Sequence, residues 1–122
     1  IIKYQKKKYK IEDFVTESIW QNSISSKDFK KTLNFINANA DYSHTFLNTL
    51  TDACFLYLRE QVKAGADVIQ IFDSWANILD ENRLNEFSMQ HISKLTYALK
   101  NDKVTSETPI ILFSRDPKCS NL

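Results

Sequence analysis

Apolar residues recur at helical spacing through the first half of the chain. Residues 1–24 give only a weak helical pattern, with its apolar positions at Ile11, Phe14, Val15 and Ile19. A clearer helix follows, which Ser25 or Ser26 can cap and whose apolar positions are Phe29, Leu33 and Ile36. The polar run at 37–40, Asn-Ala-Asn-Ala, interrupts this pattern, so we expect the helix to end there.

The strongest helical pattern lies between Asp41, a plausible N-cap, and Gly65. Its broad stripe at the 3.6-residue period comprises Tyr42, Phe46, Leu47, Leu50, Ala53, Cys54, Tyr57, Leu58 and Val62. Gly65 is the only glycine in the chain. It stands where the residue after a helix adopts a left-handed conformation, so the helix is predicted to stop there.

Two short apolar, β-branched runs predict buried strands at about 67–72 and 109–114, the second introduced by Pro109. Between them, Trp75, Ile78 and Leu79 predict a short turn or helix. Asp80 can cap a further amphipathic helix, whose apolar positions are Leu84, Phe87, Met89, Ile92, Leu95 and Leu99. A polar loop at 101–108 leads into the second strand.

This order of elements predicts an α/β fold with two parallel strands joined by a right-handed crossover through a helix. Two strands cannot close a barrel, and a (β/α)₈ barrel takes about 250 residues. We therefore expect one partial domain, a helix-rich segment of a (β/α)₈ TIM barrel at 25–115. Residues 1–24 would form a divergent N-terminal flank, and residues 116–122 an irregular tail.

Composition narrows the classes of function. The net charge of +1 gives no electrostatic argument for binding nucleic acid or a membrane. No apolar run approaches the roughly 18 residues that span a bilayer, and the start is not built like a signal peptide. We interpret Cys54 as a small core residue and Cys119 as an exposed thiol, and expect a cytoplasmic protein. One glycine in 122 residues, against a usual share of about 7%, argues against a complete active site.

The stretch 64–76, AGADVIQIFDSWA, resembles a mid-barrel segment of the uroporphyrinogen decarboxylase family. The family pattern there is A-G-A-x-x-x-Q-x-F-[DE]-S-x-A-G, and Asn77 replaces its final glycine. The preceding helix carries the family-like sequences LTDA at 50–53 and Gln-Val at 61–62. His44 also stands where many members have a histidine. The likeness extends from about Ser25 to Arg115, and the run 109–113 looks like the next barrel strand of the family.

The resemblance implies removal of carboxyl groups from the four acetate side chains of a porphyrinogen substrate, in haem and porphyrin biosynthesis. The family enzyme is a carboxy-lyase that uses no metal or organic cofactor. The reaction needs a carboxylate to hold the pyrrole N–H groups and arginines to bind substrate carboxylates. The family's arginine motif and central aspartate have no counterpart here, so we expect no activity from this chain alone and assign no catalytic residue.

Three residues remain as candidates for contact with substrate. Ser74 matches a substrate-contacting serine of the family and follows a predicted strand, at the end where barrel enzymes place their sites. Asp73 and Arg115 also stand at the ends of predicted strands. They are weaker candidates, because the sequence favours a cap or a salt-bridge partner for Asp73 and a solvated side chain for Arg115. His44 and His91 lie on predicted helices with no second ligand at metal spacing, so we interpret them as surface or packing residues and expect no metal site.

Two other interpretations stay open. The chain could be part of a related corrinoid-dependent or methionine-synthase-like methyltransferase barrel, although Asp73-Ser74-Trp75-Ala76 favours the decarboxylase and the zinc-binding His-x-Cys pattern is absent. It could instead be a non-catalytic, helix-rich interaction protein. In that case, the exposed apolar edges of its two strands would favour self-association.

Overall fold

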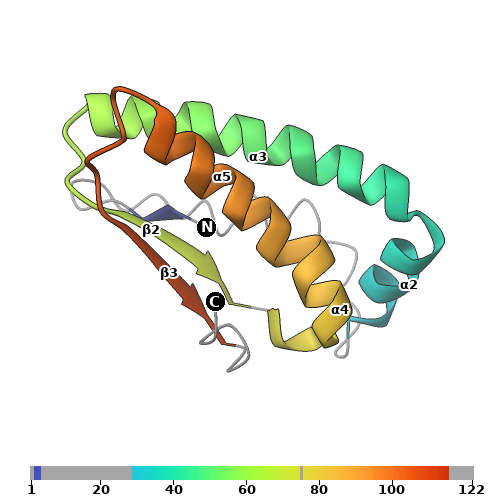
Figure 1. Cartoon of the computed structure of the whole chain (residues 1–122). Helices are drawn as coiled ribbons and strands as arrows, with labels where there is room; N and C mark the ends of the chain where they lie inside the picture. Colours follow the sequence, from blue (N-terminus) through green and yellow to red (C-terminus); the bar gives the residue numbers. More distant parts are fainter. Residues whose placement is uncertain (1, 4–28, 75, 116–122) are drawn as a thin grey trace.

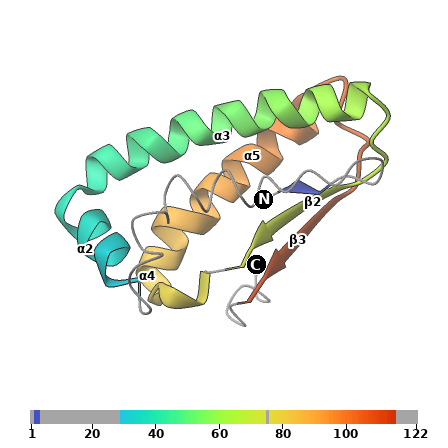
Figure 2. The same ribbon diagram turned by 180° about the vertical axis from the view of Figure 1, so that it is seen from behind.

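The computed structural model describes residues 2–3, 29–74 and 76–115 of the chain. The elements are β1 Ile2–Lys3, α2 Lys30–Ala38, α3 Ala40–Lys63, β2 Ile69–Asp73, the 3₁₀ turn η2 Ala76–Ile78, α4 Glu81–Leu84, the π-helical segment η3 Asn85–Met89, α5 Gln90–Asn101 and β3 Ile110–Ser114. The long helices α3 and α5 lie side by side above the strands (Figures 1 and 2). The two predicted strands and the helices around them are therefore confirmed.

The described strands form one sheet in the order β1-β2-β3. Strands β2 and β3 are parallel, as predicted, and their register runs from Ile69 opposite Ile110 to Asp73 opposite Ser114. Strand β1 pairs antiparallel with the other edge of β2. The weak helical pattern assigned to residues 1–24 is thus wrong at Ile2 and Lys3, because backbone pairing with β2 takes precedence over a local pattern at these positions.

Helix α3 ends as its sequence predicts. Gly65 has a φ of 102°, its N–H donates to the carbonyl of Val62, and the N–H of Ala66 donates to the carbonyl of Gln61. These two bonds form a Schellman motif, which satisfies carbonyls that the helix end leaves unpaired. The start differs from expectation: Asn39, not Asp41, is the N-cap, and Asp41 lies in the first turn, where its charge favours the helix dipole.

The second long helix has three parts. Asp80 caps it as predicted, since its carboxylate accepts a hydrogen bond of 3.0 Å from the N–H of Arg83. The five residues of η3 then interrupt the α-helical geometry before α5 resumes. A π turn contains one residue more than an α turn, so it shifts the helix face that the following residues present. The apolar spacing predicted the helix but not this insertion.

The core lies between α3, α5 and β2. Its buried members are Leu58, Ile69, Ile71, Leu95 and Leu99, and Cys54 packs against them as a partly buried residue, in agreement with its interpretation as a core position. A smaller cluster beneath α4 contains Ala76, Leu79, Leu84 and Met89. Because Ile69 and Ile71 share one face of β2, both long helices cover that same face.

The prediction that both strands are buried is wrong for β3. Strand β2 is largely covered, but Ile111, Leu112 and Phe113 are 50%, 37% and 43% exposed. The physical reason is position, because among the described residues β3 is the last strand of the sheet and has a neighbour on one side only. Its apolar sequence is typical of a strand with neighbours on both sides.

The polar loop predicted at 101–108 is present as a series of turns tied to both helices. Thr105 is fully buried, and its hydroxyl donates a hydrogen bond of 2.6 Å to the carbonyl of Leu99 near the end of α5. Asp102 pairs with Arg59 of α3 at 3.1 Å. Burial acts to raise the pKa of Asp102, but the N–H of Val104 and the charge of Arg59 outweigh it and lower the pKa.

Several predictions fall outside the described residues. These are the capping role of Ser25 or Ser26, most of the flank at 1–24, the tail at 116–122, the exposure of Cys119 and the packing of Trp75.

Candidate functional site

The carboxyl ends of β2 and β3 bring all three predicted site residues to one edge of the sheet. Asp73 is the last residue of β2 and lies opposite Ser114, the last residue of β3. Ser74 follows Asp73 directly, and Arg115 follows Ser114. Parallel strands that end in register carry the next residues out at the same edge, which is the edge where α/β proteins place their sites. We refer to Asp73, Ser74, Ser114 and Arg115 as the carboxyl-edge cluster.

Asp73 is anchored from the helix layer. The hydroxyl of Ser88, a buried residue of η3, donates a hydrogen bond to Oδ2 of Asp73. The sequence suggested a cap or a salt-bridge partner for Asp73, and the bond observed is instead to a serine hydroxyl fifteen residues along the chain. This bond holds the orientation of the Asp73 side chain.

The remaining members of the cluster differ in exposure. Ser74 is half-buried, as is Ser114, and Arg115 is exposed. A serine hydroxyl can donate to a carboxylate, and a guanidinium can bind one through two parallel hydrogen bonds. The cluster therefore offers the two kinds of donor that suit an anionic ligand, beside one carboxylate that would repel it.

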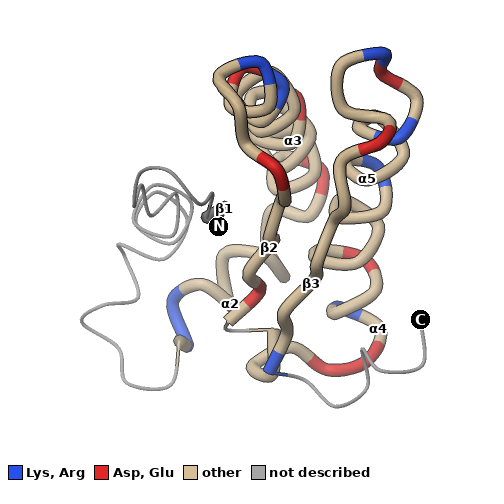
Figure 3. Tube along the Cα trace, turned by 90° about the vertical axis from the view of Figure 1, so that its left-hand side faces the viewer, with Lys and Arg blue, Asp and Glu red and all other residues tan. Residues whose placement is uncertain are grey.

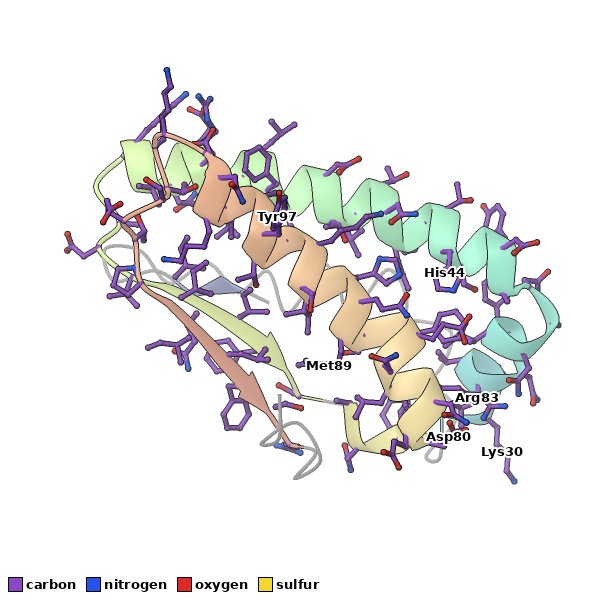
Figure 4. All side chains as sticks on the ribbon, viewed as in Figure 1. Lys30, His44, Asp80, Arg83, Met89 and Tyr97 are labelled. Atoms are coloured by element: carbon purple, nitrogen blue, oxygen red, sulfur yellow. The ribbon has the colours of Figure 1, made fainter. Side chains whose placement is uncertain are left out.

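A second cluster of polar side chains lies between α3 and the η3–α5 helix. His44 Nε2 lies 2.8 Å from Oε1 of Glu86, and His44 Nδ1 lies 3.2 Å from Nε2 of His91. The ring of Phe87 stacks on His44, with centroids 4.7 Å apart. Figure 4 shows His44 pointing from α3 into the space between the two helices. We call His44, Glu86, Phe87 and His91 the interhelix cluster.

These contacts define which nitrogens carry protons. The carboxylate of Glu86 only accepts, so we assign the proton of neutral His44 to Nε2. Nδ1 of His44 is then an acceptor, and Nε2–H of His91 donates to it. Nδ1 of His91 is left as a buried lone pair with no hydrogen-bond partner among the described residues. Burial, then the neighbouring His44 and Lys94, lower the pKa of His91.

The interhelix cluster joins α3 to the η3–α5 helix through side-chain contacts. Both nitrogens of His44 are already engaged, and no group of three His, Cys, Asp or Glu side chains in residues 2–3, 29–74 and 76–115 has the geometry to hold a metal ion. The thiol of Cys54 is no better placed for chemistry, since burial raises its pKa and keeps it protonated. The packing interpretation of both histidines agrees with these contacts.

Sequence reasoning missed the contacts within the interhelix cluster and the role of Ser88. His44 and His91 are 47 positions apart, and Ser88 belongs to a π turn that shifts the helical spacing. One weak signal was available: Glu86 and His91 lie five residues apart, the spacing that a π turn brings onto one side of a helix.

The family model described as Uroporphyrinogen decarboxylase (URO-D) matches residues 20–118. The chain belongs to the uroporphyrinogen decarboxylase family. Its relatives named uroporphyrinogen decarboxylase include proteins of Aquifex aeolicus, 42% identical over 91 residues, and of Legionella pneumophila (strain Paris), 36% identical over 92 residues. A third, from Christiangramia forsetii, is 38% identical over 90 residues.

These alignments cover 74–75% of this chain but only 25–26% of each relative. The chain thus spans about a quarter of the length of the uroporphyrinogen decarboxylases it matches. The match includes β2, β3 and the whole carboxyl-edge cluster, and it favours the decarboxylase over the methyltransferase interpretation. No helix among the described residues is long and apolar enough to cross a membrane.

Proposed function

We propose that this chain forms one strand–helix–strand unit of a uroporphyrinogen decarboxylase barrel, and that its carboxyl-edge cluster lines part of the porphyrinogen site. The observation that carries the proposal is the register of β2 and β3, which sets Asp73 opposite Ser114; Ser74 and Arg115 are the next residues along each strand. The match to family members supplies the substrate class.

The two faces of the sheet support the barrel. Ile69 and Ile71 face the helices, which in a (β/α)₈ barrel form the outer ring. Gln70 and Phe72 alternate with these isoleucines and face the opposite way, where Phe72 contacts Phe113 of β3 with ring centroids 5.6 Å apart. Apolar side chains on the face away from the helices need a second cover, and the layered side chains of a barrel interior would provide it.

The chemistry assigns a binding role to this edge, not a catalytic one. Decarboxylation breaks the bond between a carboxyl carbon and the side-chain methylene. Carbon dioxide leaves, and the electron pair of the broken bond neutralises the protonated pyrrole ring. A proton then adds to the methylene to give a methyl group, and the ring releases its own added proton. Ser74 and Arg115 are suited to holding a substrate carboxylate while this occurs. We assign none of the described residues to the carboxylate that binds the pyrrole N–H groups.

A chimera tests the binding role. Residues 29–115 would replace the matching stretch of the Aquifex aeolicus relative, and formation of coproporphyrinogen would be followed by HPLC. We expect an active chimera in which Ser74→Ala lowers kcat/KM by about tenfold or more, the value of one hydrogen bond to a charged group.

Ser93→Ala is the matched control, because Ser93 is exposed on α5, away from the carboxyl edge. Equal kcat/KM values for the two variants in a folded, active chimera would refute the role of Ser74. A chimera that folds without activity would refute the assignment of the segment.

The 122-residue chain by itself should form no coproporphyrinogen from uroporphyrinogen, because the edge described here supplies only part of the groups that the reaction requires. Purified chain would be assayed by the same HPLC method, with the Aquifex aeolicus relative as the positive control. Product formed in proportion to the concentration of the chain would overturn this expectation.

A further inference from the structure

Three alternate residues of β2 share the face of the sheet that the helices cover. These are Ile69, Ile71 and Asp73, since successive side chains of a strand point to opposite faces. The two isoleucines pack in the core beneath α3 and α5. The hydroxyl of Ser88, from η3 in the same helix layer, donates a hydrogen bond to Oδ2 of Asp73. A side-chain bond therefore ties the carboxyl end of the strand to the helix layer.

The Ser88 hydroxyl has Asp73 as its strong partner. Ser88 is 9% exposed, and its Oγ also lies 3.9 Å from the sulfur of Met89. A thioether sulfur is a weak acceptor, whereas a carboxylate oxygen is a strong one. Without the carboxylate, this buried hydroxyl would keep only the weak acceptor among the described residues, which carries a cost in free energy. The bond to Asp73 is therefore the contact that holds the hydroxyl in place.

Ser74 is the residue whose position this tie affects. The register between β2 and β3 ends with Asp73 opposite Ser114, and Ser74 follows in a turn. Figure 3 shows the two strands running side by side toward these ends. Only two soft dihedrals separate one residue from the next along the backbone. A bond that fixes the side chain of Asp73 at the last position of the register therefore also restricts where Ser74 can lie.

We propose that Ser88 is a positioning residue for the porphyrinogen site, which holds Asp73 against the helix layer and thereby fixes the strand end that carries Ser74. Ser88 acts through Asp73 and Ser74 and makes no contact with the substrate itself. The inference rests on the proposed function and extends it from the carboxyl edge of the sheet into the helix layer above it. A group held in this way loses less freedom when it binds a substrate carboxylate.

Kinetics of the chimera that carries residues 29–115 test this role. Ser88→Ala should lower kcat/KM by about three- to tenfold, the value of one hydrogen bond. The loss should appear as a higher KM with little change in kcat, because a group that holds a remote substrate carboxylate binds the ground state and the transition state alike. Ser93→Ala is the matched control, since Ser93 is exposed on α5, and it should behave like the unmodified chimera.

A double-mutant cycle with Ser74→Ala separates positioning from a general effect on folding. If Ser88 acts through Ser74, Ser88→Ala should lower kcat/KM by less than about twofold in a chimera that already carries Ser74→Ala. If Ser88 only stabilised the fold, its removal would have the same effect with and without the Ser74 hydroxyl. Thermal melts followed by circular dichroism would establish that each variant is folded at the assay temperature.

Two changes at Asp73 test the bond itself. Asp73→Asn keeps a side-chain carbonyl that can accept from the Ser88 hydroxyl, whereas Asp73→Ala removes the acceptor. We expect Asp73→Asn to retain more kcat/KM than Asp73→Ala, and we expect the effect of Asp73→Ala to shrink when Ser74→Ala is already present. This pair of variants carries the same test if Ser88→Ala prevents folding.

The outcomes distinguish this inference from the proposed function. Additive losses for Ser74→Ala and Ser88→Ala, no loss for Ser88→Ala, or equal losses for the two Asp73 variants would overturn the positioning role and leave the role of Ser74 intact. A folded but inactive chimera, or an active one indifferent to Ser74→Ala, would refute the proposed function and this inference with it.

Discussion

Leu58 and Leu56 lie two positions apart on α3 and provide a direct test of the packing described above. Leu58 is fully buried and packs with Ile69 and Ile71 of β2 and with Leu95 and Leu99 of α5, whereas Leu56 is 61% exposed. Leu58→Ala removes a side chain common to both sides of the core, and such truncations cost about 2–5 kcal/mol. Leu56→Ala makes the same chemical change, and a surface substitution of this kind alters stability by about 0.5 kcal/mol or less.

Urea unfolding followed by helical circular dichroism would measure both variants at one protein concentration. For a urea dependence of about 1–3 kcal/mol per molar, Leu58→Ala should lower the unfolding midpoint by about 0.7–5 M, and Leu56→Ala should leave it nearly unchanged. A domain of this kind is stable by only about 5–15 kcal/mol, so the loss is a large share of the total. Equal shifts for the two variants would show that α3 does not pack on β2 through this face.

Three further predictions follow from the local structure. Asp80→Ala should lower the free energy of unfolding by about 1 kcal/mol in urea titration, because it removes the N-cap of α4; the same change at exposed Glu81 should cost less. Gly65→Ala should cost about 1 kcal/mol or more, since Gly65 holds a φ of 102°, and an unchanged midpoint would argue against the Schellman ending of α3. The pKa of His91 in the folded chain lies below its ordinary 6.5, so the unfolded chain binds more protons and the free energy of unfolding should fall as pH drops below 6.5. His91→Phe should reduce this dependence of stability on pH in thermal melts between pH 7.5 and 5. The same dependence in both proteins would contradict the buried Nδ1 of His91.

Local signals in the sequence predicted the elements of this chain well. The glycine at 65 can adopt a backbone conformation that other residues avoid, and Asp80 carries a side chain that can bond to the helix start, so each acts within a few residues of itself. The strand at 69–73 was identified for the same reason, from its own apolar, β-branched composition. The predicted N-cap at Asp41 was wrong by two residues, which is the usual scale of error at helix ends.

Features that depend on distant pairing could not be read from the sequence. The antiparallel pairing of Ile2 and Lys3 with β2, the His44–His91 contact and the Ser88–Asp73 bond all join positions at least fifteen residues apart. The exposure of β3 could not be predicted for the same reason. Its apolar composition favours burial, but it does not specify how many strands lie beside it. Ser74 and Arg115 were placed correctly at strand ends, and their contact with a substrate stays a prediction.

The π-helical segment η3 limits how many residues the continuous helix α4–η3–α5 can lose or gain. One short segment supplies Glu86 to His44 on the outer side and Ser88 to Asp73 on the sheet side. Deleting a single residue between 85 and 89 would restore ordinary helical winding and rotate the preceding turn by about 100° relative to α5. Both attachments and the buried position of Leu84 would then be lost together, so this stretch should accept almost no change in its residue count.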